Sequence, residues 1–108
     1  MKGGVLVKET KIGSGPEAKK GKFVHVYYSG KLKTGKQFDK CLSGKPFKFR
    51  LGGGDVIKGW DVGIEGMKVG GKRTITIPPA MGYGSQRMGN DIPANSTLVF
   101  DVELKAVS

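Results

Sequence analysis

The residues of this chain with the most evident chemical potential are aromatic and aliphatic, and few of them are polar. The single tryptophan, Trp60, lies in the run Val56-Ile57-Lys58-Gly59-Trp60-Asp61. With it we group nine other residues spread along the chain, and the full set is Tyr28, Phe38, Asp39, Phe47, Val56, Ile57, Trp60, Tyr83, Ile92 and Phe100. Such a set forms either a solid hydrophobic core or the lining of an apolar binding pocket.

Four polar groups in this set favour the pocket. Tyr28, Tyr83 and Trp60 each carry an O–H or N–H group that needs a hydrogen-bond partner once it is buried. Asp39 directly follows Phe38, so its carboxylate lies at the margin of the apolar cluster. We therefore expect a dry cavity with a small number of polar groups at its edge.

Other catalytic and cofactor motifs fail on their spacing. A dinucleotide fingerprint needs glycine where Ile57 stands, and no Gly-Lys pair precedes Ser or Thr, as a phosphate-binding loop requires. The single histidine, His25, is expected on an outer strand face, and Cys41 is expected to be an ordinary loop thiol without a catalytic partner. We expect neither a metal nor an organic cofactor.

The composition predicts one soluble domain over residues 1–108. No stretch approaches the ~20 apolar residues of a membrane helix, and one cysteine permits no internal disulfide. The net charge is +10, and residues 1–54 hold 13 Lys and Arg against three acidic residues, whereas residues 55–108 hold six of each. Two interpretations stay open: the basic half binds nucleic acid or acidic partners, or it is a solvated face.

Alternation with a period of two predicts the strands. Apolar and polar side chains alternate in residues 22–28, 46–51, 72–77 and 97–107. Residues 5–12 are a weaker candidate for a strand at the edge of the sheet. Val24, Val26 and Tyr28 should point inward from the first of these strands, and Phe47, Phe49 and Leu51 from the second. Thr34-Gly35 should form a hairpin turn.

A single short helix should follow Gly52-Gly53-Gly54. Helical spacing places Ile57, Trp60, Ile64 and Met67 on one face, and Gly59 and Gly63 allow that face to approach a sheet closely. A long irregular segment, 79–96, follows the strand that Pro78-Pro79 ends. The expected fold is α+β, with a five- to six-stranded antiparallel sheet curled around one short helix.

Six strings in register resemble one known family. They are Val26-Tyr27-Tyr28-Ser29-Gly30, Gly35-Lys36-Gln37-Phe38-Asp39, Lys45-Pro46-Phe47-Lys48-Phe49, Val56 to Asp61, Gly82-Tyr83-Gly84, and Ile92-Pro93 with Thr97 to Leu104. In order and spacing they resemble the tacrolimus-binding immunophilins over residues 5–107. The resemblance implies an FKBP-type peptidyl-prolyl cis/trans isomerase that binds tacrolimus and rapamycin without a cofactor.

The resemblance also implies roles for the residues that match. Trp60 would form the floor under a proline ring, Val56 and Ile57 would present backbone groups, Tyr83 would offer its hydroxyl to a carbonyl, and Ile92 would close the rim. Tyr28, Phe38, Phe47 and Phe100 would form walls, while Asp39 would act electrostatically or as a hydrogen-bond partner. The catalytic group would be Tyr28, Phe38, Asp39, Trp60, Tyr83 and Phe100.

The chain departs from the family pattern in two loops. The connection after Asp39 is about one residue shorter, and Leu42-Ser43 stands where an arginine is common, so Asp39 should have less support. The rim segment Ser85 to Asp91, with Met88 and Asp91, also differs, so peptide preference does not transfer.

Within the family, the Lys-rich first half and the run Gly63 to Arg73 resemble nuclear and nucleolar members. That resemblance implies a carboxy-terminal domain of a longer chain, a nuclear or nucleolar location with cytoplasm as the alternative, and proline-containing substrates that include histone tails. We expect a monomer. A basic histone- or nucleic-acid-binding chaperone module, with its pocket as a mere peptide-binding site, is the alternative function.

Overall fold

The computed structural model describes residues 4–84 and 92–108, so the predicted rim segment Ser85 to Asp91 lies outside the described residues. Its elements, in chain order, are β1 (Leu6–Lys11), β2 (Phe23–Leu32), β3 (Gln37–Cys41), β4 (Phe47–Arg50), α1 (Lys58–Ile64), β5 (Lys72–Ile77), the 3-10 helix η2 (Pro79–Met81) and β6 (Leu98–Val107). No helix among these residues is long and apolar enough to cross a membrane.

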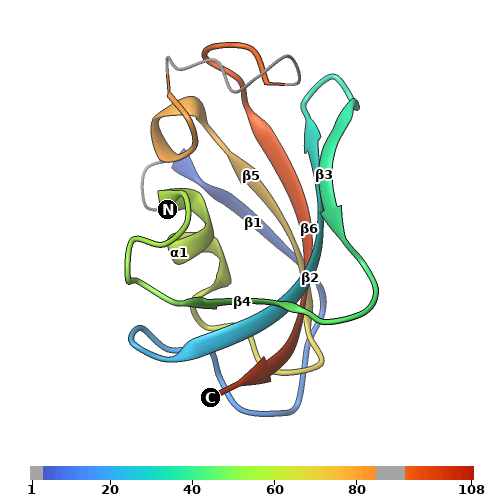
Figure 1. Cartoon of the computed structure of the whole chain (residues 1–108), viewed down its shortest axis with the longest axis vertical. Coiled ribbons are helices and arrows are strands. Elements are labelled where there is room, and N and C mark those ends of the chain that lie inside the picture. Colours follow the sequence, from blue (N-terminus) through green and yellow to red (C-terminus); the bar gives the residue numbers. More distant parts are fainter. Residues whose placement is uncertain (1–3, 85–91) are drawn as a thin grey trace.

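The strands form one antiparallel sheet that curves around α1 (Figure 1). The order is β1-β5-β6-β2-β3, and β4 pairs with β2 as well. The first part of β2, Phe23 to Val26, pairs with β4, and its later part, Tyr28 to Lys31, pairs with β3. One edge of β2 therefore carries two short strands, and the chain leaves the sheet between them. This arrangement confirms the predicted α+β fold.

The predicted alternation holds on the inner face. Val24 and Val26 of β2 and Leu98, Phe100, Val102 and Leu104 of β6 are buried. β2 continues four residues beyond the predicted 22–28, because the hairpin turn comes only at residues 33–36, where Gly35 has a φ of 100°. Cys41 was wrongly expected in a loop, since it ends β3 and pairs with Tyr28.

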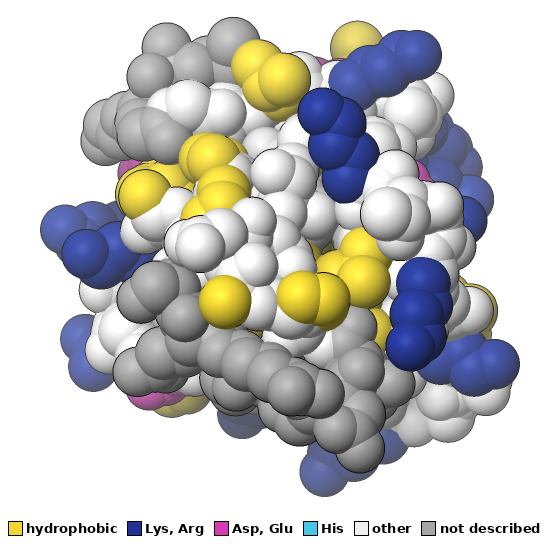
Figure 2. Space-filling view, turned by 90° about the horizontal axis from the view of Figure 1, so that it is seen from above, with side chains coloured by type: hydrophobic (Ala, Val, Ile, Leu, Met, Phe, Trp, Pro, Cys, Tyr) yellow, Lys and Arg dark blue, Asp and Glu magenta, His cyan; other side chains and the backbone are white. Residues whose placement is uncertain are grey.

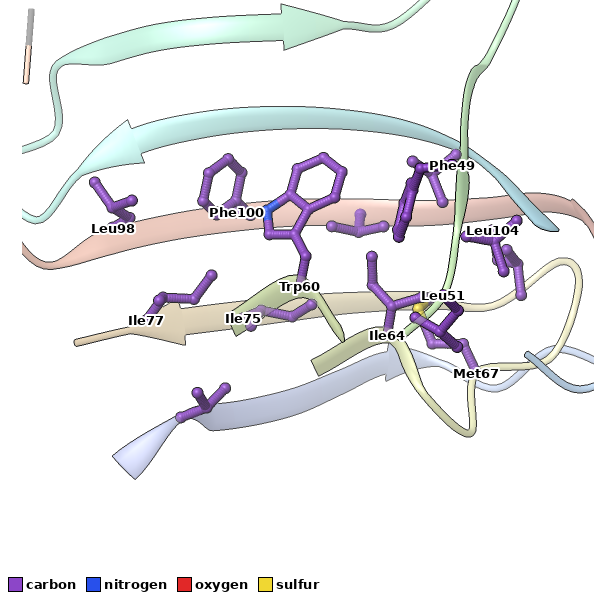
Figure 3. Packing of buried hydrophobic residues seen from close by; sticks show 14 of the residues in the cluster. Phe49, Leu51, Trp60, Ile64, Met67, Ile75, Ile77, Leu98, Phe100 and Leu104 are labelled. Carbon is purple, nitrogen blue, oxygen red and sulfur yellow. The ribbon is translucent and has the colours of Figure 1, made fainter. Parts of the chain in front are cut away.

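The helix lies against β5 through its two glycines. A Cβ atom on Gly59 would come within 2.5 Å of the Ile77 side chain, and one on Gly63 within 2.6 Å of the Ile75 side chain. Such distances do not occur between real side chains, so only glycine permits this approach. Figure 3 shows Trp60 and Ile64 directed from α1 toward the side chains of the sheet.

The helix is shorter than its apolar pattern predicts. Met67 was expected on the helical face, but α1 ends at Ile64 and the chain turns at Gly66, whose φ is 90°. This left-handed conformation suits glycine and stops the helix. Met67 is nevertheless completely buried, because the turn returns it to the core beneath α1 (Figure 3).

Candidate functional site

An open cavity of about 400 Å³ lies between α1 and the inner face of the sheet. Nine of the ten predicted site residues line it, together with Asp55, and the lining set is Tyr28, Phe38, Asp39, Phe47, Asp55, Val56, Ile57, Trp60, Tyr83 and Phe100. The predicted side chains thus surround a hollow rather than a solid interior, and the volume is within the usual range for small-ligand sites.

Trp60 forms the floor of the cavity. It is 4% exposed, and the centroid of its indole lies 4.8 Å from the Tyr28 ring, 5.1 Å from Phe100 and 5.9 Å from Phe47. All three contacts are edge-to-face, the arrangement in which aromatic quadrupoles attract. A fourth ring, Phe49, lies 5.6 Å from the indole, so Trp60 is held by four rings while it lines the cavity.

The walls differ in how far they are buried. Phe100 is 3% exposed, whereas Phe47 is 38% exposed although it points to the same side as the buried Phe49. Phe47 was expected inward with Phe49, and its exposure follows from its place at the mouth of the cavity. An apolar ring held at an opening is an anchor for an apolar ligand rather than core packing.

A β-bulge brings Phe38 and Asp39 to the same side of β3. Gly30 pairs with Asp39 but Lys31 pairs with Gln37, so Phe38 is the extra residue. Neighbouring residues in a regular strand point to opposite faces, and the bulge removes this alternation. As a result, the ring and the carboxylate both line the cavity.

Gly30 is a site residue that the sequence reasoning missed. A Cβ atom there would lie 2.6 Å from the Phe100 ring and 3.0 Å from the Phe38 ring. The two rings meet edge-to-face at 5.6 Å in the space that glycine leaves. The sequence analysis used the motif Tyr28-Ser29-Gly30, but nothing in that motif indicated that its last position must lack a side chain.

Two described residues hold Asp39 by hydrogen bonds. The Tyr28 hydroxyl donates to its Oδ2 atom at 2.8 Å, and the Lys40 backbone N–H donates to Oδ1 at 2.8 Å. The loop without an arginine predicted a poorly held Asp39 side chain, but these two hydrogen bonds fix its carboxylate. Burial, and then the hydrogen bond to Asp39, raises the pKa of Tyr28 well above its ordinary value.

Tyr83 lines the cavity, and Ile92 does not. Burial, and then the charge of Asp39, raises the pKa of Tyr83, so its hydroxyl keeps the proton that it would donate to a ligand. Ile92 is 6% exposed and belongs to the buried core, and it is not among the lining residues. Its role at the rim stays a prediction.

Side chains that commonly bind metal ions do not cluster in the described part of the chain. Among residues 4–84 and 92–108, no group of three or more His, Cys, Asp and Glu side chains could hold a metal ion. His25 is on the outer face as predicted, with its Nε2 atom 3.3 Å from the Ser108 hydroxyl. The cavity therefore offers shape, apolar surface and a few polar groups.

Comparison with known proteins agrees with this geometry. The family model for the FKBP-type peptidyl-prolyl cis-trans isomerase matches residues 15–105. The 39 kDa FK506-binding nuclear protein of Drosophila melanogaster is 62% identical over 106 residues, which are 97% of this chain and 30% of that protein. The 46 kDa FK506-binding nuclear protein of Spodoptera frugiperda is 61% identical over 97% of this chain and 26% of its own length. The chain thus spans less than a third of these curated relatives.

Solved structures of the same kind have the same fold. The peptidyl-prolyl cis-trans isomerase of Pseudomonas syringae pv. tomato superposes with a TM-score of 0.89 at 38% identity, covering 100% of this chain and 78% of that one. The structure of AtFKBP13 superposes with a TM-score of 0.87 at 42% identity, and the match covers 99% of this chain and 95% of that one. The resemblance drawn from the six sequence strings is confirmed, and the chain belongs to the FKBP-type peptidyl-prolyl cis-trans isomerase family.

Proposed function

We propose that this domain catalyses cis/trans isomerisation of X-Pro bonds in the cavity floored by Trp60. The observation that carries the proposal is the cavity itself: aromatic rings on its floor and walls, with Asp39 and Tyr83 as polar groups at its margin. A pyrrolidine ring is small, compact and largely apolar, and it complements such a lining.

The reaction needs no nucleophile. The planar amide is stabilised by resonance, and a barrier of about 18–20 kcal/mol separates its two isomers. At the twisted transition state this resonance is lost, so the carbonyl and the nitrogen carry less separated charge. An apolar site disfavours the more polar planar state, and lowering the barrier by about 6 kcal/mol accelerates rotation on the order of ten-thousandfold.

The polar groups orient the amide in this scheme. The Tyr83 hydroxyl donates to the substrate carbonyl, and its raised pKa keeps it protonated at a pH where a free tyrosine would begin to ionise. Val56 and Ile57 offer backbone groups beside it. Asp39 acts through its charge and its hydrogen bond with Tyr28, and it transfers no proton.

The test is turnover of a short prolyl peptide, followed by exchange NMR, with and without rapamycin. Phe38→Ala should lose activity while the fold is retained, because Phe38 is a half-buried wall of the cavity. Phe23→Ala is the matched control, since Phe23 is 42% exposed and lies on the outer face. Rapamycin binding without turnover would reduce the domain to a binding module and refute the proposed catalysis.

The names and lengths of the relatives support three finer proposals. FK506-binding nuclear proteins are 61% and 62% identical to this chain, so we propose that it binds FK506-type macrolides and acts in the nucleus as one domain of a longer protein. Imaging of the full-length protein decides the location, and sedimentation of the domain tests the expectation of a monomer.

We also propose that the basic half contacts nucleic acid. Every described Lys and Arg of residues 4–54 is exposed. Figure 2 shows Lys and Arg side chains projecting around exposed hydrophobic ones at one end of the molecule.

Charge decides which nuclear partner this surface favours. Histone tails are themselves basic and would be repelled, whereas DNA or RNA releases counterions on binding. A histone tail therefore fits the proline pocket better than the basic surface. The measurement is the slope of log affinity for duplex DNA against log salt concentration, and a slope near zero would refute the nucleic-acid contact.

A further inference from the structure

The connection between β3 and β4, residues 42–46, joins two walls of the cavity. Asp39 in β3 and Phe47 in β4 both line it. Figure 1 shows this connection swinging out from the edge of the sheet. Because the distance between the two walls depends on its path, movement of the connection would change the width of the pocket mouth.

Little packing holds this connection. Leu42 is 58% exposed, and residues 43–45 are exposed as well. Gly44 has a φ of 74°, and a Cβ atom there would meet nothing within 4 Å. A segment with few buried contacts opens at low free energy unless hydrogen bonds restrain it.

Tyr27 supplies such a restraint from the opposite face of the sheet. Its hydroxyl donates a hydrogen bond to the Gly44 carbonyl oxygen, and the Lys105 ammonium lies 5.5 Å from the centroid of its ring. The Cys41 thiol, 3.7 Å from the Lys45 carbonyl oxygen, adds only a weak contact. Tyr27 therefore makes the strongest described contact to the middle of the connection.

We infer that Tyr27 is a positioning residue for the proline pocket, an inference that rests on the proposed isomerase function. The two adjacent tyrosines of β2 then serve the site from opposite faces. Tyr28 holds Asp39 from inside, and Tyr27 holds the connection to Phe47 from outside. Tyr27 touches neither the cavity nor a substrate, so it acts only through the connection.

The expected effect falls on substrate affinity. Phe47 contacts planar and twisted substrate alike, so loosening it weakens both states equally and raises KM. Asp39 stays bound to Tyr28, and kcat should change little. Loss of one neutral hydrogen bond shifts a local equilibrium on the order of fivefold, which limits the rise in KM to about two- to fivefold.

The test is Tyr27→Phe, which removes the hydroxyl and keeps the ring beneath Lys105. Ser29→Ala is the matched control, because Ser29 lies on the same outer face of β2 and has no described hydrogen bond to the connection. We expect hydrogen exchange of the ladder amides of β3 and β4 that flank the connection to accelerate about fivefold in Tyr27→Phe, with KM raised two- to fivefold and kcat retained. Ser29→Ala should match the wild type in all three quantities.

Gly44→Ala provides a second perturbation of the same segment, through strain at its positive φ. If Tyr27 and Gly44 act through one connection, the double variant should show less than the product of the two single effects on KM.

Unchanged amide exchange, or faster exchange with an unchanged KM, would overturn the inference, and so would a fall in kcat at constant KM. If the wild-type domain turns over no prolyl peptide, the proposed function fails on its own. Amide exchange together with the affinity for rapamycin then still decides whether Tyr27 positions the pocket.

Discussion

Replacing Gly59 by alanine tests whether the cavity depends on the close approach of α1 to β5. The added Cβ atom would lie 2.5 Å from the Cγ2 atom of Ile77 and 2.6 Å from its Cγ1 and Cδ1 atoms. Ile77 is completely buried, so rotating its side chain removes one clash only by creating another. The helix must therefore move away from the strand, and Trp60 moves with it.

The expected change in the free energy of unfolding is the difference between two opposing effects. Alanine in place of glycine stabilises a helix by at most about 1 kcal/mol. Overpacking a core typically costs about 1–3 kcal/mol, and three contacts below 3.0 Å place this site in the upper part of that range. We expect a net loss of about 1–2 kcal/mol, or roughly 5–10 °C in Tm for a domain of this size. Displacement of the pocket floor should lower kcat/KM at least about tenfold.

Urea unfolding followed by Trp60 fluorescence measures the loss of stability, because Trp60 is the single tryptophan, and turnover of a prolyl peptide measures kcat/KM. Lys58→Ala, at an exposed position of the same helix, is the control and should leave stability within about 0.5 kcal/mol. The double variant Gly59→Ala with Ile77→Ala should lose less than the sum of the single losses, since the second change removes the clashing atoms. A Gly59→Ala protein that is more stable than the wild type and equally active would refute the reasoning.

Three further predictions concern the pocket directly. Asp39→Val should abolish most isomerase activity at unchanged far-UV circular dichroism, and wild-type turnover would contradict the role of this carboxylate. Trp60→Ala should cost about 3–5 kcal/mol of unfolding free energy as well as activity, because Trp60 is 4% exposed and leaves a cavity under the sheet; an unchanged Tm would be inconsistent with its burial. The raised pKa of Tyr28 and Tyr83 keeps both hydroxyls protonated, so activity should be constant from about pH 6 to about pH 9. Their contribution to stability is complete below the ordinary tyrosine pKa of 10.0 and should decline above it as unfolded tyrosines ionise; a loss of stability between pH 7 and 9 would not fit.

Much of the fold was predictable because its signals are local. Alternating side chains in 72–77 and 97–107 matched β5 and β6 to within a residue, since a strand with one buried face must repeat with a period of two. Gly59 and Gly63 were correctly assigned to the close approach of helix and sheet. The apolar period was less reliable at the end of the helix, where Gly66 turned the chain before Met67.

The sequence by itself determined which rings are available, the strand alternation and the family, because each depends on residue order alone. Only the tertiary structure decided which side Phe38 takes and which rings meet. The bulge at Phe38 reverses the alternation of β3, and the bare position at Gly30 lets two rings from different strands meet. Whether ten such residues enclose a cavity or a solid core depends on long-range strand register, and no local pattern carries that information.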